Sequence, residues 1–164
     1  MMSHKKFLSL ILISILVCLS LSSYAQGLKV KSPYHDIKVK VTGCEESGNA
    51  VLVTLLLENT GNRDFDFSIC GGYDNYSMAV DDEGNKFSGE NILVKIGNGY
   101  YNQLFIMDKM ISDFPLKVTM KIIGVPEHAT SFSRINLWFN SNDIQVYEQP
   151  IMISNLPINR DGDE

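Results

Sequence analysis

Residues 116–122 read LKVTMKI, a run in which apolar residues alternate with Lys or Thr at every second position. This period of two is typical of a β-strand with one buried face, because successive side chains of a strand point to opposite faces of the sheet. The same alternation occurs at 37–41 and at 135–139. Residues 50–57, AVLVTLLL, are apolar almost throughout, which predicts a central strand that is covered on both sides.

Weaker strand patterns surround these four runs. They occur at 65–69, 76–80, 92–96, 103–107 and 144–153, with turn-forming segments rich in Gly, Asn and Asp between them. No segment of about 12 residues or more carries the stripe of an amphipathic helix. One short helical turn is expected at 107–114, where Pro115 would end it. The pattern predicts an all-β fold, an immunoglobulin-like antiparallel β-sandwich of about 7–9 strands.

The N-terminus has the three parts of a secretory signal peptide in order. A short basic region at 4–6 precedes an apolar run at 7–21, and residues 23–25 (Ser-Tyr-Ala) provide the small side chains of a cleavage site. We therefore expect residues 1–25 to be removed, which makes Gln26 the new N-terminus. The mature protein is then exported, to the periplasm or to the outside of the cell.

Lipidation at Cys18 is the alternative to this cleavage, but the apolar run continues beyond the cysteine, which disfavours a lipid anchor. The chain that remains after cleavage contains no second long apolar run, so we expect no membrane span in the mature protein. Its length suits a single sandwich domain at 26–158, followed by a flexible polar tail at 159–164.

The charge balance argues against nucleic acid as a partner. The whole chain has 14 Lys and Arg against 19 Asp and Glu, and loss of Lys5 and Lys6 would lower the first count to 12 and bring the net charge to −7. A net acidic chain without a basic run repels a phosphate backbone.

Cys44 and Cys70 remain after cleavage. An isolated pair in an oxidising compartment often forms a disulfide, so we expect a Cys44–Cys70 bond, with two buried free thiols as the alternative. A bond requires Cα atoms within about 7 Å. If both neighbouring strands flank 50–57 in one sheet, the cysteines start too far apart, and one of them must cross a loop or join the other sheet.

Nothing in the sequence forms a catalytic or metal-binding constellation. His35 and His128 fall in predicted loops, without a serine or cysteine placed as the nucleophile of a triad. Two cysteines are too few for a structural zinc site. The acidic segment 81–85 lacks the spacing of a calcium-binding loop and is expected to be a hairpin tip. We therefore expect no enzymatic activity, no metal and no cofactor.

Aromatic residues are the candidate binding residues. They are Tyr73, Tyr76, Tyr100, Tyr101 and Trp138. Their flat faces suit a sugar ring or a protein surface. Trp138 lies on the polar side of the alternation at 135–139, so it is either exposed or covered by a loop or a neighbouring strand. Tyr73 and Tyr76 belong to a Gly-rich segment whose composition suits either a binding loop or an ordinary mobile connection.

Three longer segments carry a resemblance to known proteins. Residues 51–61 combine a strand with an Asn-x-Gly turn, residues 78–87 combine a strand with an Asp-x-x-Gly hairpin, and 132–139 form a late strand. With the signal peptide, they are similar to small secreted immunoglobulin-like sandwiches of Bacteroides-type bacteria. The resemblance implies an immunoglobulin-type sandwich and brings no catalytic residues. Trp138 follows both cysteines, which departs from the Cys…Trp…Cys order of antibody domains.

These observations favour an exported, non-catalytic binding or accessory domain that contacts a protein partner through its loops or one sheet face. A carbohydrate-binding module that uses exposed aromatic side chains is the alternative.

Overall fold

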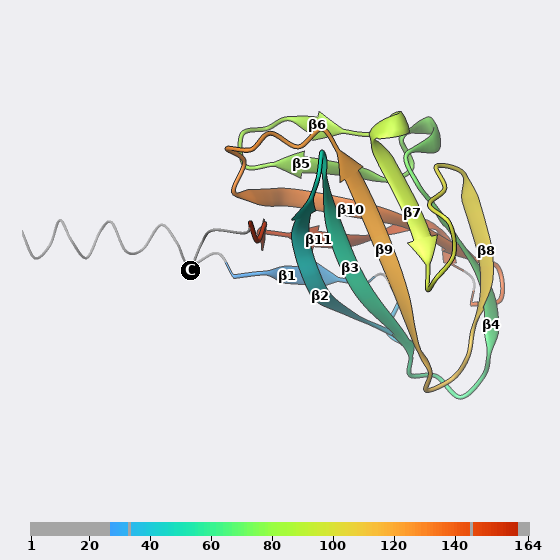
Figure 1. Cartoon of the computed structure of the whole chain (residues 1–164). Helices are drawn as coiled ribbons and strands as arrows, with labels where there is room; N and C mark the ends of the chain where they lie inside the picture. Colours follow the sequence, from blue (N-terminus) through green and yellow to red (C-terminus); the bar gives the residue numbers. More distant parts are fainter. Residues whose placement is uncertain (1–26, 33, 145, 161–164) are drawn as a thin grey trace, which may run out of the picture.

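The computed structural model describes residues 27–32, 34–144 and 146–160, whose strands form two antiparallel sheets that face each other (Figure 1). This arrangement confirms the predicted all-β sandwich. The expected signal peptide at 1–25, with Cys18, and residues 161–164 of the expected tail lie outside the described residues. Within the described part, no helix has the length and apolar character needed to cross a bilayer.

The smaller sheet has four strands in the order β2-β3-β9-β7. These strands are β2 (Ile37–Ser47), β3 (Ala50–Asn59), β9 (Pro115–Ile123) and β7 (Ile92–Ile96). β3 lies inside the sheet, with β2 on one side and β9 on the other, as the apolar run at 50–57 predicts.

The two faces of β3 are buried to different extents. Leu55 points between the sheets and is fully buried, whereas Leu56 points to the outer face and is half-buried. In the ladder, Leu56 lies between Lys40 of β2 and Lys117 of β9. Lysine stems can cover apolar surface while their ammonium groups stay in water. The expectation that β3 is covered on both sides is therefore confirmed for the core face, whereas the outer face is only partly covered.

The larger sheet follows the order β1-β11-β10-β4-β8, with β5, β6 and β12 attached beside this path. Its strands are β1 (Lys29–Lys31), β4 (Phe65–Cys70), β5 (Met78–Asp81), β6 (Lys86–Phe87), β8 (Phe105–Met110), β10 (Ser131–Ser141), β11 (Val146–Ser154) and β12 (Leu156–Pro157). β10 organises the sheet: one half pairs with β5 and the other with β4, while β12 and β11 pair along its other side.

Alternate residues of both sheets fill the space between them. On β10 the inward residues are Ile135, Leu137 and Phe139, all fully buried, as the alternation at 135–139 predicts. The ring of Phe139 stacks on that of Phe67 from β4, with centroids 5.3 Å apart. Burial of such side chains is the main stabilising contribution to a sandwich of this size.

The structure differs from the prediction in two places. It has more strands than seven to nine, since β1, β6 and β12 are runs of only two or three residues. The helical turn expected at 107–114 is wrong, because β4 provides a hydrogen-bonding edge along which β8 pairs as far as Met110, and Pro115 begins β9. Beyond β12, the Asn159 N–H donates to the Cys44 carbonyl of β2 at 2.8 Å.

The contrast between the faces of β3 gives a test of the core. Leu55→Ala should lower the free energy of unfolding by about 2–5 kcal/mol, because it leaves a cavity between the sheets. Leu56→Ala, the matched change on the outer face, should cost about half of that or less. Urea unfolding of both variants measures the difference, and equal losses would contradict this assignment of the faces.

Candidate functional site

Three of the five candidate aromatic residues come together on the outer face of the larger sheet. Trp138 lies 5.1 Å from Tyr76 and 5.2 Å from Phe105, measured between ring centroids. Phe105 also contacts Tyr76 at 5.4 Å and Tyr73 at 6.2 Å. We call these four side chains the aromatic cluster. Phe105, which sequence analysis did not select, is its central member.

Trp138 is the buried centre of this face and not an exposed platform. Only 6% of the residue is exposed, because Tyr76 and Phe105 cover the indole ring. The indole Nε1 is buried and has no hydrogen-bond partner among the described residues. Of the two positions that the sequence allowed for Trp138, the structure therefore shows the covered one.

The segment that covers Trp138 is held by its backbone. Gly72 N–H donates to the Ile92 carbonyl at 2.8 Å, and a Cβ at Gly72 would lie 1.9 Å from the Gly89 carbonyl oxygen. Only glycine permits so close an approach of two backbones. The Ser77 hydroxyl then donates to the Cys70 carbonyl at 2.6 Å and accepts from the backbone N–H of Trp138 at 2.9 Å. The Gly-rich composition thus reflects close packing in addition to any role in binding.

Tyr100 and Tyr101 lie apart from the aromatic cluster. Tyr100 is 96% exposed, in the connection between β7 and β8. The ring of Tyr101 has the ammonium groups of Lys95 and Lys121 at 4.7 and 5.7 Å from its centroid, and these lysines belong to the smaller sheet. Partial burial raises the pKa of the Tyr101 hydroxyl. The five candidates therefore do not form one surface.

The predicted Cys44–Cys70 disulfide is wrong, since both cysteines are free and buried. Cys44 on β2 belongs to the core between the sheets. Cys70 on β4 is paired with Trp138 on one side and Phe105 on the other, and it shares their outward face. The two thiols thus lie on different sheets and on opposite sides of the larger one. Burial raises the pKa of Cys44 to about 12 and that of Cys70 to about 11, which keeps both protonated at neutral pH.

Sequence analysis missed an exposed apolar surface along β8, at the right of Figure 1. The exposed side chains of β8 and its flanks include Leu104, Phe105, Met107, Ile111 and Phe114, which we call the apolar edge. Met107 is 82% exposed. The available signal was the uninterrupted apolar run 104–107. Such a run predicts a strand, but a sequence does not show which strand will lie at the margin of a sheet.

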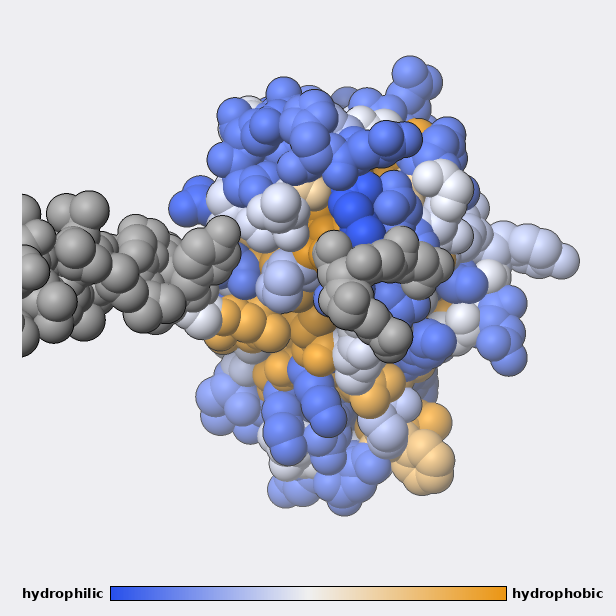
Figure 2. Space-filling model, turned by 60° about the vertical axis from the view of Figure 1, so that its left-hand side comes forward, coloured by the Kyte–Doolittle hydropathy of each residue, from blue (hydrophilic) through white to orange (hydrophobic). Residues whose placement is uncertain are grey.

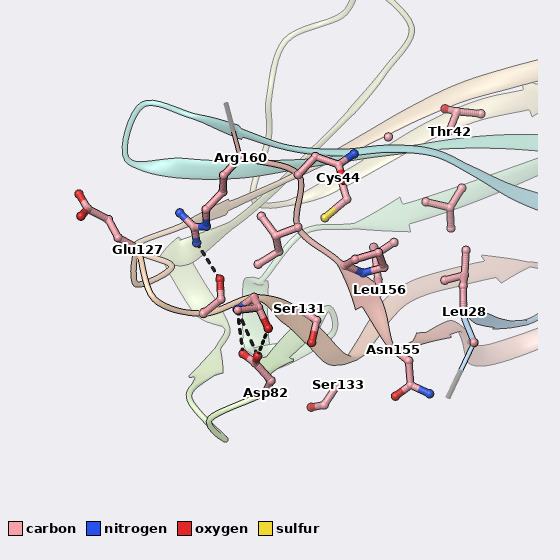
Figure 3. A pocket seen from close by; sticks show the side chains of 18 residues that line it. Leu28, Thr42, Cys44, Asp82, Glu127, Ser131, Ser133, Asn155, Leu156 and Arg160 are labelled. Carbon is pink, nitrogen blue, oxygen red and sulfur yellow. Dashed lines mark hydrogen bonds between the residues drawn. The ribbon is translucent and has the colours of Figure 1, made fainter. Parts of the chain in front are cut away.

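A hollow of about 1180 Å³ opens on another side of the molecule, between β2 and the C-terminal segment. Figure 2 shows apolar colouring between two polar margins on the face where the two sheets meet at β1 and β2. Cys44, Leu156 and Leu28 line this hollow, and its polar rim includes Asp82 and Arg160 (Figure 3).

Two charged groups of this rim, Asp82 and Arg160, form hydrogen bonds within the protein. The Arg160 guanidinium donates to the Pro126 and Ala129 carbonyls at 2.8 and 3.0 Å, and to Glu46 at 2.7 Å. The Asp82 carboxylate accepts the Thr130 hydroxyl at 2.5 Å. Burial alone would raise the pKa of Asp82, but hydrogen bonds from Thr130 outweigh it and hold this pKa below its usual range. These contacts attach Arg160 and Asp82 to neighbouring segments, while the buried Arg160 Nε has no hydrogen-bond partner among the described residues.

His35 and His128 lie at the surface in local pairs. His128 Nε2 is 2.7 Å from Glu83, and His35 Nε2 is 3.0 Å from Asp36. Among the described residues, no group of three His, Cys, Asp or Glu side chains is placed to hold a metal ion.

Comparison with known proteins finds distant similarity to solved structures and identifies no family. No family model matches the chain, and no curated protein does so. Solved structures with a similar fold include a PapD-like domain of human CEP192 (TM-score 0.41, 13% identity, 83% of this chain and 92% of that one). Another is self-complemented MyfA, the major subunit of the Myf fimbriae of Yersinia enterocolitica (0.41, 11%, 81% and 98%). A third is a family 123 glycoside hydrolase of Clostridium perfringens (0.39, 8%, 82% and 27%).

The state of the cysteines can be measured directly. Denatured without reductant, the protein should take up iodoacetamide at both Cys44 and Cys70, as read by peptide mass spectrometry. The folded protein should react slowly at pH 8, because burial raises both pKa values above the ordinary value near 9.0. Labelling that requires prior reduction would show a disulfide and contradict the structure.

Proposed function

We propose that this chain is an exported, non-catalytic domain that binds a protein partner through the apolar edge at β8. The carrying observation is that five of the eight exposed large hydrophobic side chains of the described residues belong to β8 and its flanks, of which Met107 at 82% and Phe114 at 69% are the most exposed. Several exposed apolar side chains on one element mark an interaction surface more often than a single one does.

Three other strands at sheet margins, β1, β2 and β7, have features that disfavour the addition of a further strand. Lys29 and Lys31 occupy the three-residue strand β1, and Lys38 and Lys40 lie on β2. Lysines and short strands are the usual means of preventing unwanted strand addition. On β7, Val94 exchanges backbone hydrogen bonds of 2.9 and 2.8 Å with Asn102.

Export is the second part of the proposal and rests on the signal-peptide pattern at 1–25. The non-catalytic part rests on the positions of the ionisable groups. The thiols of Cys44 and Cys70 are buried with raised pKa values, Asp82 and Arg160 form hydrogen bonds within the fold, and His35 and His128 form surface pairs.

Carbohydrate binding is the weaker candidate. A sugar platform needs an accessible aromatic face, but Trp138 is covered and the Tyr101 ring has two lysine ammonium groups near it. Tyr100 has an accessible ring, and it stands apart from the aromatic cluster.

The proposal predicts that binding depends on β8. Displayed random peptides selected on the purified wild-type protein, and counter-selected on Met107→Asp, should yield sequences that shift the amide resonances of 105–109. Met107→Asp should weaken their binding at least about tenfold, equivalent to 1.4 kcal/mol. Tyr100→Asp is the matched control and should leave binding unchanged. Peptides that bind both proteins equally, or a selection without enrichment, would contradict the proposal.

A further inference from the structure

The backbone of β8 has one side bonded and one side open. The Cys70 and Asp66 carbonyls of β4 accept hydrogen bonds from Ser77 and Ser141, and these two serines pack on the β10 side. Each residue of a strand directs both its N–H and its C=O to one side, and the next residue directs both to the other side. The backbone groups of the alternate residues Phe65, Phe67 and Ile69 therefore face β8 and bond to it.

Their partners on β8 are the even-numbered residues Ile106, Asp108 and Met110. The backbone groups of Phe105, Met107 and Lys109 consequently face away from β4. One hydrogen bond supports this assignment independently: the Lys109 N–H donates to the Asp108 carboxylate at 2.8 Å. In the described part of the chain, β8 ends its sheet and has no strand partner on that side.

The side chains of the same three residues lie on the outer face. Phe105 is opposite Cys70 and Met107 is opposite Ser68, while Lys109 forms a 3.7 Å ion pair with Asp66. An aromatic ring, a flexible thioether and a cation thus follow one another at every second position.

This order is complementary to itself when reversed. We propose that the occupant of the apolar edge is a second copy of this chain, with β8 paired antiparallel to β8 about a two-fold axis at Met107. The proposal rests on the proposed function, because it names the partner of the same surface. The axis places Met107 opposite Met107 of the second copy and Phe105 opposite Lys109. Ring and ammonium are then cross-strand neighbours, the arrangement of a cation–π contact.

Hydrogen bonding selects the same register. In an antiparallel pair, opposite residues exchange both hydrogen bonds only when the backbone groups of both point toward the partner. The axis at Met107 pairs odd-numbered residues with odd-numbered residues. Phe105, Met107 and Lys109, which all lie within β8, then all find partners on the second copy. An axis at Lys109 would place like charges opposite each other, and an axis at Phe105 would extend the pairing beyond the strand. A two-fold interface of this kind is closed, so it forms dimers and not filaments.

The test uses the exported protein purified after expression of its full-length coding sequence. Sedimentation equilibrium from about 1 μM to about 1 mM spans the range in which a small interface dissociates. The mean mass should rise from one chain to two across this series. Tyr100→Lys, an equally exposed change away from β8, should follow the wild-type curve.

Two charge variants identify the register. Met107→Asp and Met107→Lys each place like charges across the axis, so each should lower the association constant at least about tenfold, the effect of 1.4 kcal/mol. Mixed in equal amounts, they should restore dimers, because Asp then lies opposite Lys. Met107 is so exposed that both variants should fold, which their thermal unfolding curves verify.

Three results would overturn the inference: a wild type that stays monomeric at every concentration, single variants that dimerise as well as the wild type, or folded variants that remain monomeric when mixed. A monomeric wild type that still binds selected peptides through 105–109 would overturn the self-pairing while leaving the proposed function intact. A wild type that neither dimerises nor binds selected peptides through 105–109 would contradict the proposed function as well.

Discussion

Successive side chains of β10 point to opposite faces of the larger sheet, and both the core and the candidate surface depend on this alternation. Leu137 and Phe139 fill the space between the sheets, while Trp138 between them faces outward. A shift of one residue in register would exchange these roles. The same pleat places Cys70 beside Trp138 on the outer face, which separates it from Cys44 in the core and leaves both thiols free.

The outer face of the larger sheet becomes less covered toward β8. Trp138 on β10 is closed over by Tyr76 and Phe105, and the backbone contacts of Gly72 hold that cover in place. Two strands further, Met107 is almost entirely in solvent. The buried Trp138 therefore packs beneath Phe105. The accessible apolar surface lies further out, on the remaining residues of β8 and its flanks. Because of this gradient in exposure, we propose that binding occurs at the apolar edge and not at Trp138 or its neighbours in the aromatic cluster.

Apolar runs and period-two patterns located the interior strands because both are local features of a sequence. The runs at 50–57, 116–122 and 135–139 correspond to β3, β9 and β10. The helical turn expected at 107–114 failed because β4, which is distant in sequence, supplies hydrogen bonds to β8. The disulfide failed for a related reason: chain order does not show that Cys44 and Cys70 face different sides. Likewise, the sequence does not show that Trp138 lies with Phe105 on the larger sheet while Tyr101 lies beside lysines of the smaller one, because this depends on which strands become neighbours.

The central claim is that β8 presents one open backbone edge, and amide hydrogen exchange measured by NMR on a dilute sample tests it most directly. The account predicts an alternation along one strand, with slow exchange at Ile106, Asp108 and Met110, which bond to β4, and fast exchange at Phe105 and Met107. Uniform protection of 105–110 in the dilute monomer would show that another part of the chain covers the edge. Uniformly fast exchange would show that β8 is not paired with β4. Either result would contradict the account.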